Sequence, residues 1–376
     1  MFIKDFAIHI KKISKPRVLQ APIVALYQPY LYAKGLRSMG YNADYMVFDF
    51  APFKWLARGC DIDLQIDGSN GLQVDKTREI EFLLYAIDNY DIFHFHSGFG
   101  LLNPIYSLWE RLDDIKYLKK MGKKVVISWW GCDVRTEQVD IVYPYSACNE
   151  CEETVRRDCN TSIQKKELIQ KAFELADLNL SNGDLAASYK NITWIDNPID
   201  CNEWKPISYD EIPAEFRLPK TEKTLIYHSF GNSQTRGDVK GTQYIKEAVE
   251  RLQSEGYKVE FIFFDNIESN DLKYFQAQAD IVIDQLRAGW YGSTAVECMS
   301  IGKPVVTYIR PEVEAILPHK HPVINANIDN IYSVIKDLLD NESKWKDTGK
   351  ISRQYAQEYH HYTKIAEYLD KLYKRI

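Results

Sequence analysis

Two cations lie on either side of a short glycine-containing loop in the second half of the sequence. An apolar run ends at His228-Ser229-Phe230-Gly231, Arg236 follows, and Lys240-Gly241-Thr242 leads into a helical pattern. Fixed cations next to the N-terminus of a helix suit an anionic group such as a diphosphate, because the first N–H groups of a helix have no intrahelical acceptor and its dipole favours negative charge. Ser229, Arg236 and Lys240 are therefore candidate phosphate-binding residues.

A second glycine loop lies about fifty residues further along the chain. A strand-like run reaches Asp284, the loop contains Gly289-Trp290-Tyr291-Gly292, and a helical pattern starts at Ser293-Thr294. Glycines let the backbone approach a ligand closely. Glu297 lies on the first turns of this helix, where its carboxylate could accept hydrogen bonds from the two hydroxyls of a ribose. The alternative for Glu297 is a purely structural role at the positive end of the helix dipole.

Four cysteines form a third pattern in the first half of the chain. Cys148 and Cys151 make a C-x2-C pair, with Cys132 before them and Cys159 after them. Four thiolates with such a half-site can hold a structural zinc ion in tetrahedral geometry. Free thiols and a disulfide remain open as alternatives. A zinc ion with four thiolate ligands would staple the segment 134–160 and would have no open position for chemistry.

The elements that must hold these residues alternate between short apolar runs and amphipathic stretches, which predicts parallel sheets covered by helices. The Asp196-Asn197-Pro198 break and the polar stretch after it predict a domain boundary. We expect one domain at 1–198, completed by a terminal helix at 360–376, and a second at 199–359. Two doubly wound domains form a cleft where the carboxyl ends of their strands meet. The strands are expected at 17–21, 43–48, 91–96, 124–129, 178–181, 192–195, 224–229, 259–264, 281–284, 304–309 and 322–325.

The composition restricts the class of partner. A formal net charge of −6 argues against nucleic acid, which usually requires a basic surface. No run approaches the roughly 20 apolar residues of a membrane span. The first sixteen residues carry four lysines among apolar residues but lack a signal-peptide pattern, so the alternatives are a solvated tail or a peripheral membrane contact. We expect a cytoplasmic protein.

Residues 224–310 resemble the donor half of the retaining GT-B glycosyltransferases, the group that includes sucrose synthases and phosphatidylinositol mannosyltransferases. The resemblance rests on the Arg236…Lys240-Gly-Thr loop, the Gly-x-x-Gly loop, and Glu297-Cys-Met-Ser-Ile-Gly-Lys-Pro-Val-Val. It continues more loosely through Asp91-Ile-Phe-His94-Phe-His96, Asn197-Pro198-Ile199-Asp200 and the terminal helix. It implies a GT-B fold of two Rossmann-like domains.

The resemblance also implies roles for residues of the second domain. Arg236 and Lys240 would grip the diphosphate of a nucleotide-sugar donor, and Glu297 would bind the ribose. The segment that contains Gly289, Tyr291, Gly292, Ser293 and Thr294 would hold the sugar and the distal phosphate.

Two departures from the family pattern concern the reacting sugar. Gly289 stands where the family often has a glutamate that contacts the donor sugar, so the contact must come from the backbone or a neighbour such as Tyr291. Trp130 stands close to where the family often has a histidine, which leaves Asp133 and His96 as the candidate catalytic residues.

Together these features predict a hexosyltransferase that moves a sugar from a nucleoside diphosphate, UDP by default and GDP otherwise, to an acceptor hydroxyl with retention. No catalytic metal is expected. The acceptor would be a glycan, a lipid-linked sugar or a protein, in cell-envelope or glycoconjugate biosynthesis. A sugar-nucleotide 2-epimerase and a catalytically silent scaffold of the same fold are the alternatives.

Overall fold

The computed structural model describes residues 15–49, 59–65, 76–102, 112–135, 144–151, 163–230, 237–264 and 269–376. The chain divides into two compact units, of which the first holds 1–135, 161–198 and 362–376 and the second holds 136–160 and 199–361. The boundary after Pro198 lies where the sequence predicted it. The segment 136–160, expected in the first domain, groups with the second unit.

The first unit is built on a seven-stranded parallel sheet with the strand order β3-β2-β1-β4-β5-β6-β7. Its strands are β1 (Arg17–Ala21), β2 (Asn42–Val47), β3 (Ile62–Asp63), β4 (Ile92–His96), β5 (Lys124–Ser128), β6 (Leu178–Ser181) and β7 (Thr193–Trp194). The strands β1 and β4–β6 are almost entirely buried, as expected for a sheet covered on both faces. Among the described strands of this unit, only β3 has no counterpart in the sequence prediction.

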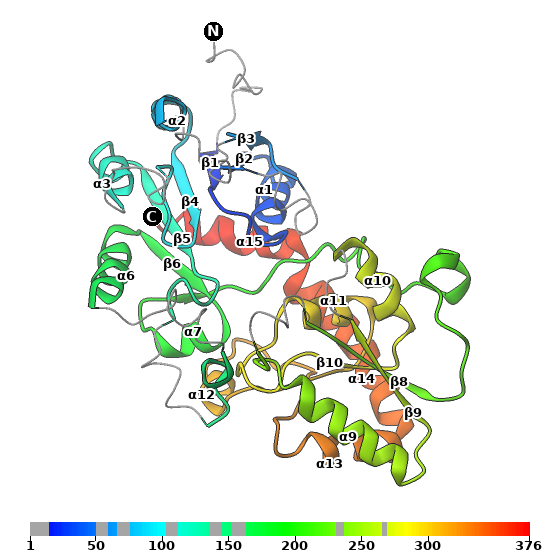
Figure 1. Cartoon of the computed structure of the whole chain (residues 1–376). Helices are drawn as coiled ribbons and strands as arrows, with labels where there is room; N and C mark the ends of the chain where they lie inside the picture. The colour runs from blue at the N-terminus through cyan, green and yellow to red at the C-terminus, as the bar shows by residue number, and fades with distance from the viewer. Residues whose placement is uncertain are drawn as a thin grey trace. The chain divides into compact units, whose positions relative to one another are not determined.

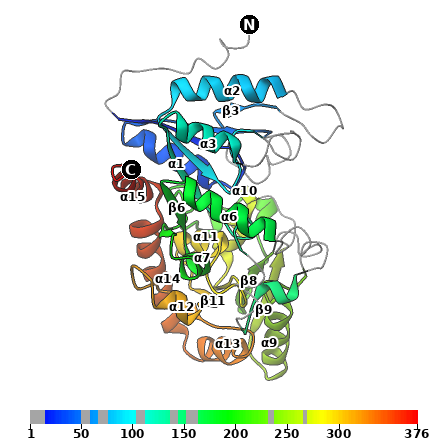
Figure 2. The ribbon, with the colours of Figure 1, turned by 90° about the vertical axis from the view of Figure 1, so that its left-hand side faces the viewer.

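Helices cover both faces of this sheet. The apolar residues of α2 (Lys76–Asn89), α3 (Asp113–Lys120) and α6 (Ile163–Leu175) share a core on one face, which Figure 2 shows toward the viewer. On the other face lie α1 (Gln28–Ser38) and α15 (Tyr362–Tyr373), the last helix of the chain. Gly35 lets these two helices approach closely, because a Cβ atom there would lie 2.7 Å from the carbonyl oxygen of Tyr362. A short helix, α7 (Gly183–Ser188), follows β6.

The second unit is built on a five-stranded parallel sheet with the order β12-β11-β10-β8-β9. Figure 1 labels its strands β8, β9 and β10. The strands are β8 (Thr224–Ser229), β9 (Val259–Phe264), β10 (Ile281–Ile283), β11 (Val305–Thr307) and β12 (Ile324–Asn325). Its helices are α9 (Thr242–Ser254), α10 (Ser269–Gln278), α11 (Ser293–Ile301), α12 (Pro311–Glu314), α13 (Ile331–Asp340) and α14 (Glu342–Tyr355), followed by a π-helical turn at Ala356–His360. The apolar faces of α9 and α13 pack on one side of the sheet. No helix among the described residues is long and apolar enough to cross a membrane.

Candidate functional site

Lys240 is fixed at the edge of the second sheet by two acceptors. Its ammonium group donates to the carboxylate of Asp284 at 3.0 Å and to the main-chain carbonyl of Ser229 at 3.1 Å. Ser229 ends β8 and Asp284 follows β10, and these strands are neighbours in the sheet. Because both strands are parallel, their carboxyl ends meet at one edge, the usual place for a ligand in a doubly wound sheet. The Lys240 side chain keeps 17% of its surface exposed there.

Asp284 links Lys240 to the second glycine loop. Its side chain is fully buried, and its other carboxylate oxygen accepts a hydrogen bond of 2.6 Å from the main-chain N–H of Gly292. A buried carboxylate is tolerated when a cation and N–H donors offset its charge, as here. The space is tight, since a Cβ atom on Gly292 would lie 3.3 Å from the Asp284 carboxylate. One buried charge therefore fixes both of the elements that the sequence assigned to phosphate binding.

The helix α11 begins directly after this contact. Gly292 is its N-cap residue and no side chain caps the helix, so Ser293 and Thr294 open a first turn whose N–H groups have no intrahelical acceptor. Both residues are half-buried. Ser229, Lys240, Gly292, Ser293 and Thr294 therefore lie around one edge of one sheet, in an arrangement suited to an anion.

Glu297 lies one turn further along α11 and is almost fully buried. Its carboxylate accepts a hydrogen bond of 3.0 Å from the side-chain amide of Gln276, on α10. This contact gives Glu297 a structural role between two helices and orients its carboxylate. The ribose-binding role that the resemblance implies stays a prediction.

His228 supports the loop that carries Lys240, a role that the sequence did not reveal. Its Nδ1 atom donates to the carbonyl oxygen of Ile283 at 2.8 Å, and its Nε2 atom accepts from the Thr242 hydroxyl at 2.9 Å. Burial, assisted by the charge of Lys240, lowers the pKa of His228 to about 4. The neutral ring thus joins the neighbouring strand β10 to the start of α9. The placement of a histidine at the end of a strand was the only available signal for this role.

The Gly289 loop has no room for a side chain at its first glycine. Gly289 adopts a φ of +81°, and a Cβ atom there would lie 2.4 Å from the side chain of Arg310. The main-chain N–H of Arg310 donates to the Gly289 carbonyl at 3.0 Å, and Gln285 donates to the Trp290 carbonyl within the loop. A glutamate of the kind that the family often has here is therefore excluded by the geometry as well as by the sequence.

Tyr291 is buried, contrary to the expectation that it contacts the donor sugar. Its ring stacks on Trp290 with centroids 3.9 Å apart, and its hydroxyl makes a 3.0 Å hydrogen bond with His360. Only 2% of the residue is exposed. The prediction that Tyr291 contacts the sugar is corrected, because the aromatic pair packs into the interior against the π-helical turn.

His96, a candidate catalytic residue of the first unit, is buried at the carboxyl end of β4. Its Nε2 atom donates to the side-chain carbonyl of Gln20 at 2.8 Å, and its ring stacks against those of Tyr32 and Trp130, with centroids 5.7 and 5.6 Å away. Burial, followed by the neighbouring His94, holds the pKa of His96 well below its ordinary value. Within the described residues, His96 Nδ1 and Trp130 Nε1 are buried without a hydrogen-bond partner. Two unsatisfied polar atoms in one cluster are typical of a site that takes a water molecule or a ligand hydroxyl.

Asp133, the other candidate, is bound within its own turn. Its carboxylate accepts hydrogen bonds from the N–H groups of Trp130, Gly131 and Val134 at 2.8 to 3.1 Å. Burial raises its pKa, while these N–H groups act in the opposite direction. These contacts account for the residue without a substrate, and a chemical role for Asp133 stays a prediction.

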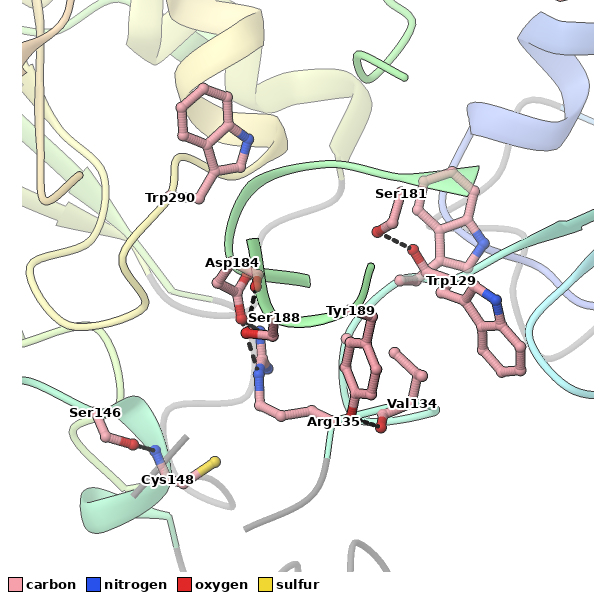
Figure 3. A network of polar contacts seen from close by, with 12 residues as sticks. Trp129, Val134, Arg135, Ser146, Cys148, Ser181, Asp184, Ser188, Tyr189 and Trp290 are labelled. Atoms are coloured by element: carbon pink, nitrogen blue, oxygen red, sulfur yellow. Dashed lines mark hydrogen bonds and ion pairs between the residues drawn. The ribbon is translucent and has the colours of Figure 1, made fainter. Parts of the chain in front are cut away.

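Two further contacts fix the loop that carries Asp133 (Figure 3). The guanidinium of Arg135 pairs with the carboxylate of Asp184, and the Tyr189 hydroxyl donates to the carbonyl of Val134 at 2.8 Å. Asp184 and Tyr189 follow β6, the strand next to β5. The loop after β5 is therefore held by α7 and its C-cap, which follow the neighbouring strand β6.

The structure tests the zinc prediction only in part. Cys132 is exposed, whereas Cys148 and Cys151 are half-buried at the short turn Ala147–Glu150, where the Ser146 hydroxyl accepts from Cys148 N–H at 3.1 Å (Figure 3). None of these three forms a disulfide in the described part of the chain. Over the described ranges, no group of three potential metal ligands comes together. Cys159 and Arg236 lie outside the described residues.

Solved structures with the same fold cover nearly all of the chain. Sucrose-phosphate synthase from Thermosynechococcus elongatus aligns with 96% of this chain and 98% of its own, with a TM-score of 0.61 and 14% identity. HepE from Anabaena, solved with UDP and glucose, aligns over 96% and 100% with a TM-score of 0.59 and 14% identity. UDP-GlcNAc 2-epimerase from Neisseria meningitidis reaches a TM-score of 0.55 at 13% identity, with 96% and 100% covered. The two Rossmann-like units are therefore those of a GT-B fold.

A sequence family also matches part of the second unit. Residues 231–355 match the family described as glycosyl transferases group 1, which covers the Lys240 loop, both glycines of the second loop and Glu297. Curated protein sequences gave no match. The chain thus has a GT-B fold, and its segment 231–355 matches the glycosyl transferases group 1 family, as the resemblance indicated.

Proposed function

We propose that the protein transfers a hexose from a nucleoside diphosphate sugar to an acceptor hydroxyl with retention at the anomeric carbon. The observation that carries this proposal is the fixed arrangement of Lys240, Asp284 and Gly292 beside the uncapped start of α11. The anion that this edge suits is a diphosphate, since one side-chain cation and the N–H groups of a helix start face it together. UDP is the default nucleotide, in line with the UDP complexes of HepE.

The chemical task of this site is to stabilise the leaving group. Negative charge grows on the diphosphate as the bond to the sugar breaks, and donors aimed at that charge lower the barrier. In our proposal Arg236, Lys240 and the first N–H groups of α11 supply this stabilisation, so no catalytic metal is required. Glu297 accepts hydrogen bonds from the ribose hydroxyls, with Gln276 holding its carboxylate in place.

The acceptor is proposed to bind the first unit near His96 and Trp130. Their unsatisfied ring nitrogens could contact an acceptor hydroxyl directly or through a water molecule. The low pKa of His96 makes it a poor proton acceptor at neutral pH, so we assign it to positioning. We propose a glycan, a lipid-linked sugar or a protein as the acceptor, and a role in cell-envelope or glycoconjugate biosynthesis in the cytoplasm, with peripheral membrane contact through the basic N-terminal residues.

The test starts with UDP and GDP sugars in a thermal-shift assay, followed by measurement of donor hydrolysis. Lys240→Ala should lower kcat/KM by about 100-fold, the scale for a donor that acts on developing charge. Lys246→Ala is the matched control, because Lys246 is an exposed lysine of α9 whose contact is a long ion pair with Glu250. Conversion of the free nucleotide sugar into an epimer would instead establish an epimerase. An intact sugar under all conditions would indicate a binding protein.

A further inference from the structure

A pocket of about 480 Å³ lies at the edge of the second sheet, beside the Gly289 loop. Its walls follow β11 and β12, so it opens at the same edge as Lys240 and Asp284. Its lining includes Tyr145, Tyr308, Glu312, Asn327 and Asn330. None of them is part of the site described above.

One wall of the pocket is formed by part of the segment 136–160, which comes from the first half of the sequence and groups with the second unit. Tyr145 meets the ring of Tyr308 edge-on, with centroids 5.2 Å apart, and its hydroxyl donates to Asp329. The same segment is anchored again by an ion pair of 3.2 Å between Glu150 and Arg287, whose guanidinium lies over the Tyr244 ring. These contacts hold two aromatic rings at a fixed angle in the pocket.

The polar groups of the pocket still have hydrogen-bonding capacity. Asn327 and Asn330 use their side-chain oxygens to accept main-chain N–H groups, which leaves both NH₂ groups as donors. The carboxylate of Glu312 lines the pocket and is exposed. Burial raises the pKa of Tyr308, so its hydroxyl stays protonated and can donate. Aromatic faces with several donors and one carboxylate match a sugar ring, which has apolar C–H faces and a rim of hydroxyls.

The sheet order gives the direction of a bound nucleotide sugar. Glu297, the proposed ribose-binding residue, bonds to Gln276 on α10, a helix that packs against β8, and so marks the ribose end on the β8 side. The diphosphate position at Lys240 and Gly292 belongs to β8 and β10. The next strands along the edge are β11 and then β12, where the pocket lies. A donor that follows this order therefore places its sugar at the pocket.

The Gly289 loop gives a second reason to place the donor sugar at this pocket. No side chain fits at Gly289, so the loop cannot supply the carboxylate that the related enzymes often use there. The hydrogen bond between Arg310 N–H and the Gly289 carbonyl brings the chain that carries Glu312, two residues further on, next to the same loop. A carboxylate is thus available beside the loop although it comes from another element.

We propose that this pocket recognises the hexose of the donor, with Glu312 accepting from sugar hydroxyls, Asn327 and Asn330 donating to them, and Tyr308 packing on the ring. The inference rests on the proposed function and extends it by assigning the residues that select the sugar.

The experiment compares nucleotide with nucleotide sugar by isothermal titration calorimetry, using UDP, UDP-glucose, UDP-galactose and UDP-GlcNAc, with GDP and GDP-mannose for the other base. Wild-type protein should bind one of the sugars more tightly than the bare nucleotide. Glu312→Gln should weaken the binding of that nucleotide sugar about tenfold, the scale for losing a charged acceptor. The affinity for the bare nucleotide should stay within about twofold of the wild-type value. Tyr308→Ala should act in the same direction.

Glu314→Gln is the matched control, because Glu314 belongs to the same short helix but pairs with His321 and does not line the pocket. An equal loss for nucleotide and nucleotide sugar, or no loss in Glu312→Gln, would overturn the sugar assignment while leaving the proposed function intact. Wild-type protein that binds none of the six compounds would overturn both.

Discussion

Replacing Asp284 with Asn tests whether one buried charge organises the donor site. An amide has only one oxygen, so it can accept from Lys240 or from Gly292 N–H, and its NH₂ group must face the other donor. Breaking a buried ion pair from one side costs about 3–5 kcal/mol. Asp284 is fully buried but Lys240 is 17% exposed, so water can partly replace the lost contact and we expect about 3 kcal/mol.

The assay is urea unfolding of four proteins: the wild type, Asp284→Asn, Lys240→Met and the double variant. In a thermal melt of the same proteins, a loss of about 3 kcal/mol in a unit of this size corresponds to a fall in melting temperature of roughly 6–12 °C. The double variant should recover at least about 1 kcal/mol relative to the sum of the single losses, because no unpaired charge remains buried. Donor turnover should fall about 100-fold in each single variant.

Additive stability losses, within about 0.5 kcal/mol, would refute the reasoning, since they would mean that the two side chains do not interact. The readout that separates positioning from mere stability is nucleotide binding below the melting temperature. A folded Asp284→Asn protein with native affinity for UDP and native kcat would show that Lys240 needs no help from Asp284.

Three further predictions concern other parts of the molecule. Glu297→Gln should weaken donor binding by about 1.5–3 kcal/mol, and removing the ribose 2′-hydroxyl should then cost the variant little; additive losses measured by calorimetry would place the ribose elsewhere. The pKa of His228 is lowered to about 4, so the unfolded chain binds more protons below about pH 6.5, and stability should be complete above that pH and fall toward pH 4 by about 1.4 kcal/mol per pH unit for this group. His228→Asn, which keeps a donor for the Ile283 carbonyl, should flatten that slope in urea titrations between pH 7 and 5, and an unchanged slope would contradict the assignment. Elemental analysis of protein purified without chelator should find about one zinc per chain, lost in Cys151→Ser, whereas full alkylation of Cys132, Cys148, Cys151 and Cys159 in active, metal-free protein would exclude the zinc site.

The sequence predicted the sheets well because their strands are short apolar runs bounded by glycine, proline or polar residues. The largely apolar run Val259–Phe264 predicted a strand correctly, although this strand lies at the edge of its sheet and only Val259 in it is fully buried. The start of α11 could be predicted for a similar reason, since Gly292 and Ser293-Thr294 have the composition of a helix entrance. These signals come from residues that are close together in the sequence, so they can be recognised without knowing the tertiary structure.

The partnerships between distant residues could not be predicted in this way. Asp284 and Lys240 are 44 positions apart, and Tyr145 and Asp329 are 184 apart, so their contacts depend on strand order and on which unit receives the segment 136–160. Tyr291 misled the prediction for the same reason. An aromatic residue in a glycine loop is typical of a sugar platform, but its actual partner His360 comes from the far end of the chain.

The ion pair at the centre of the donor site has a consequence for how the charge of the diphosphate is met. A lysine side chain carries about 2 kcal/mol of rotamer entropy, and the contact with Asp284 fixes that side chain during folding, before the donor arrives. The same contact neutralises most of the field of Lys240, because the two opposite charges lie 3.0 Å apart. Lys240 alone therefore cannot offset a diphosphate, and Arg236 with the first N–H groups of α11 must supply the remaining positive potential. The ion pair with Asp284 thus fixes the Lys240 side chain but weakens its positive potential. We therefore expect the site to need both cations and the helix start together.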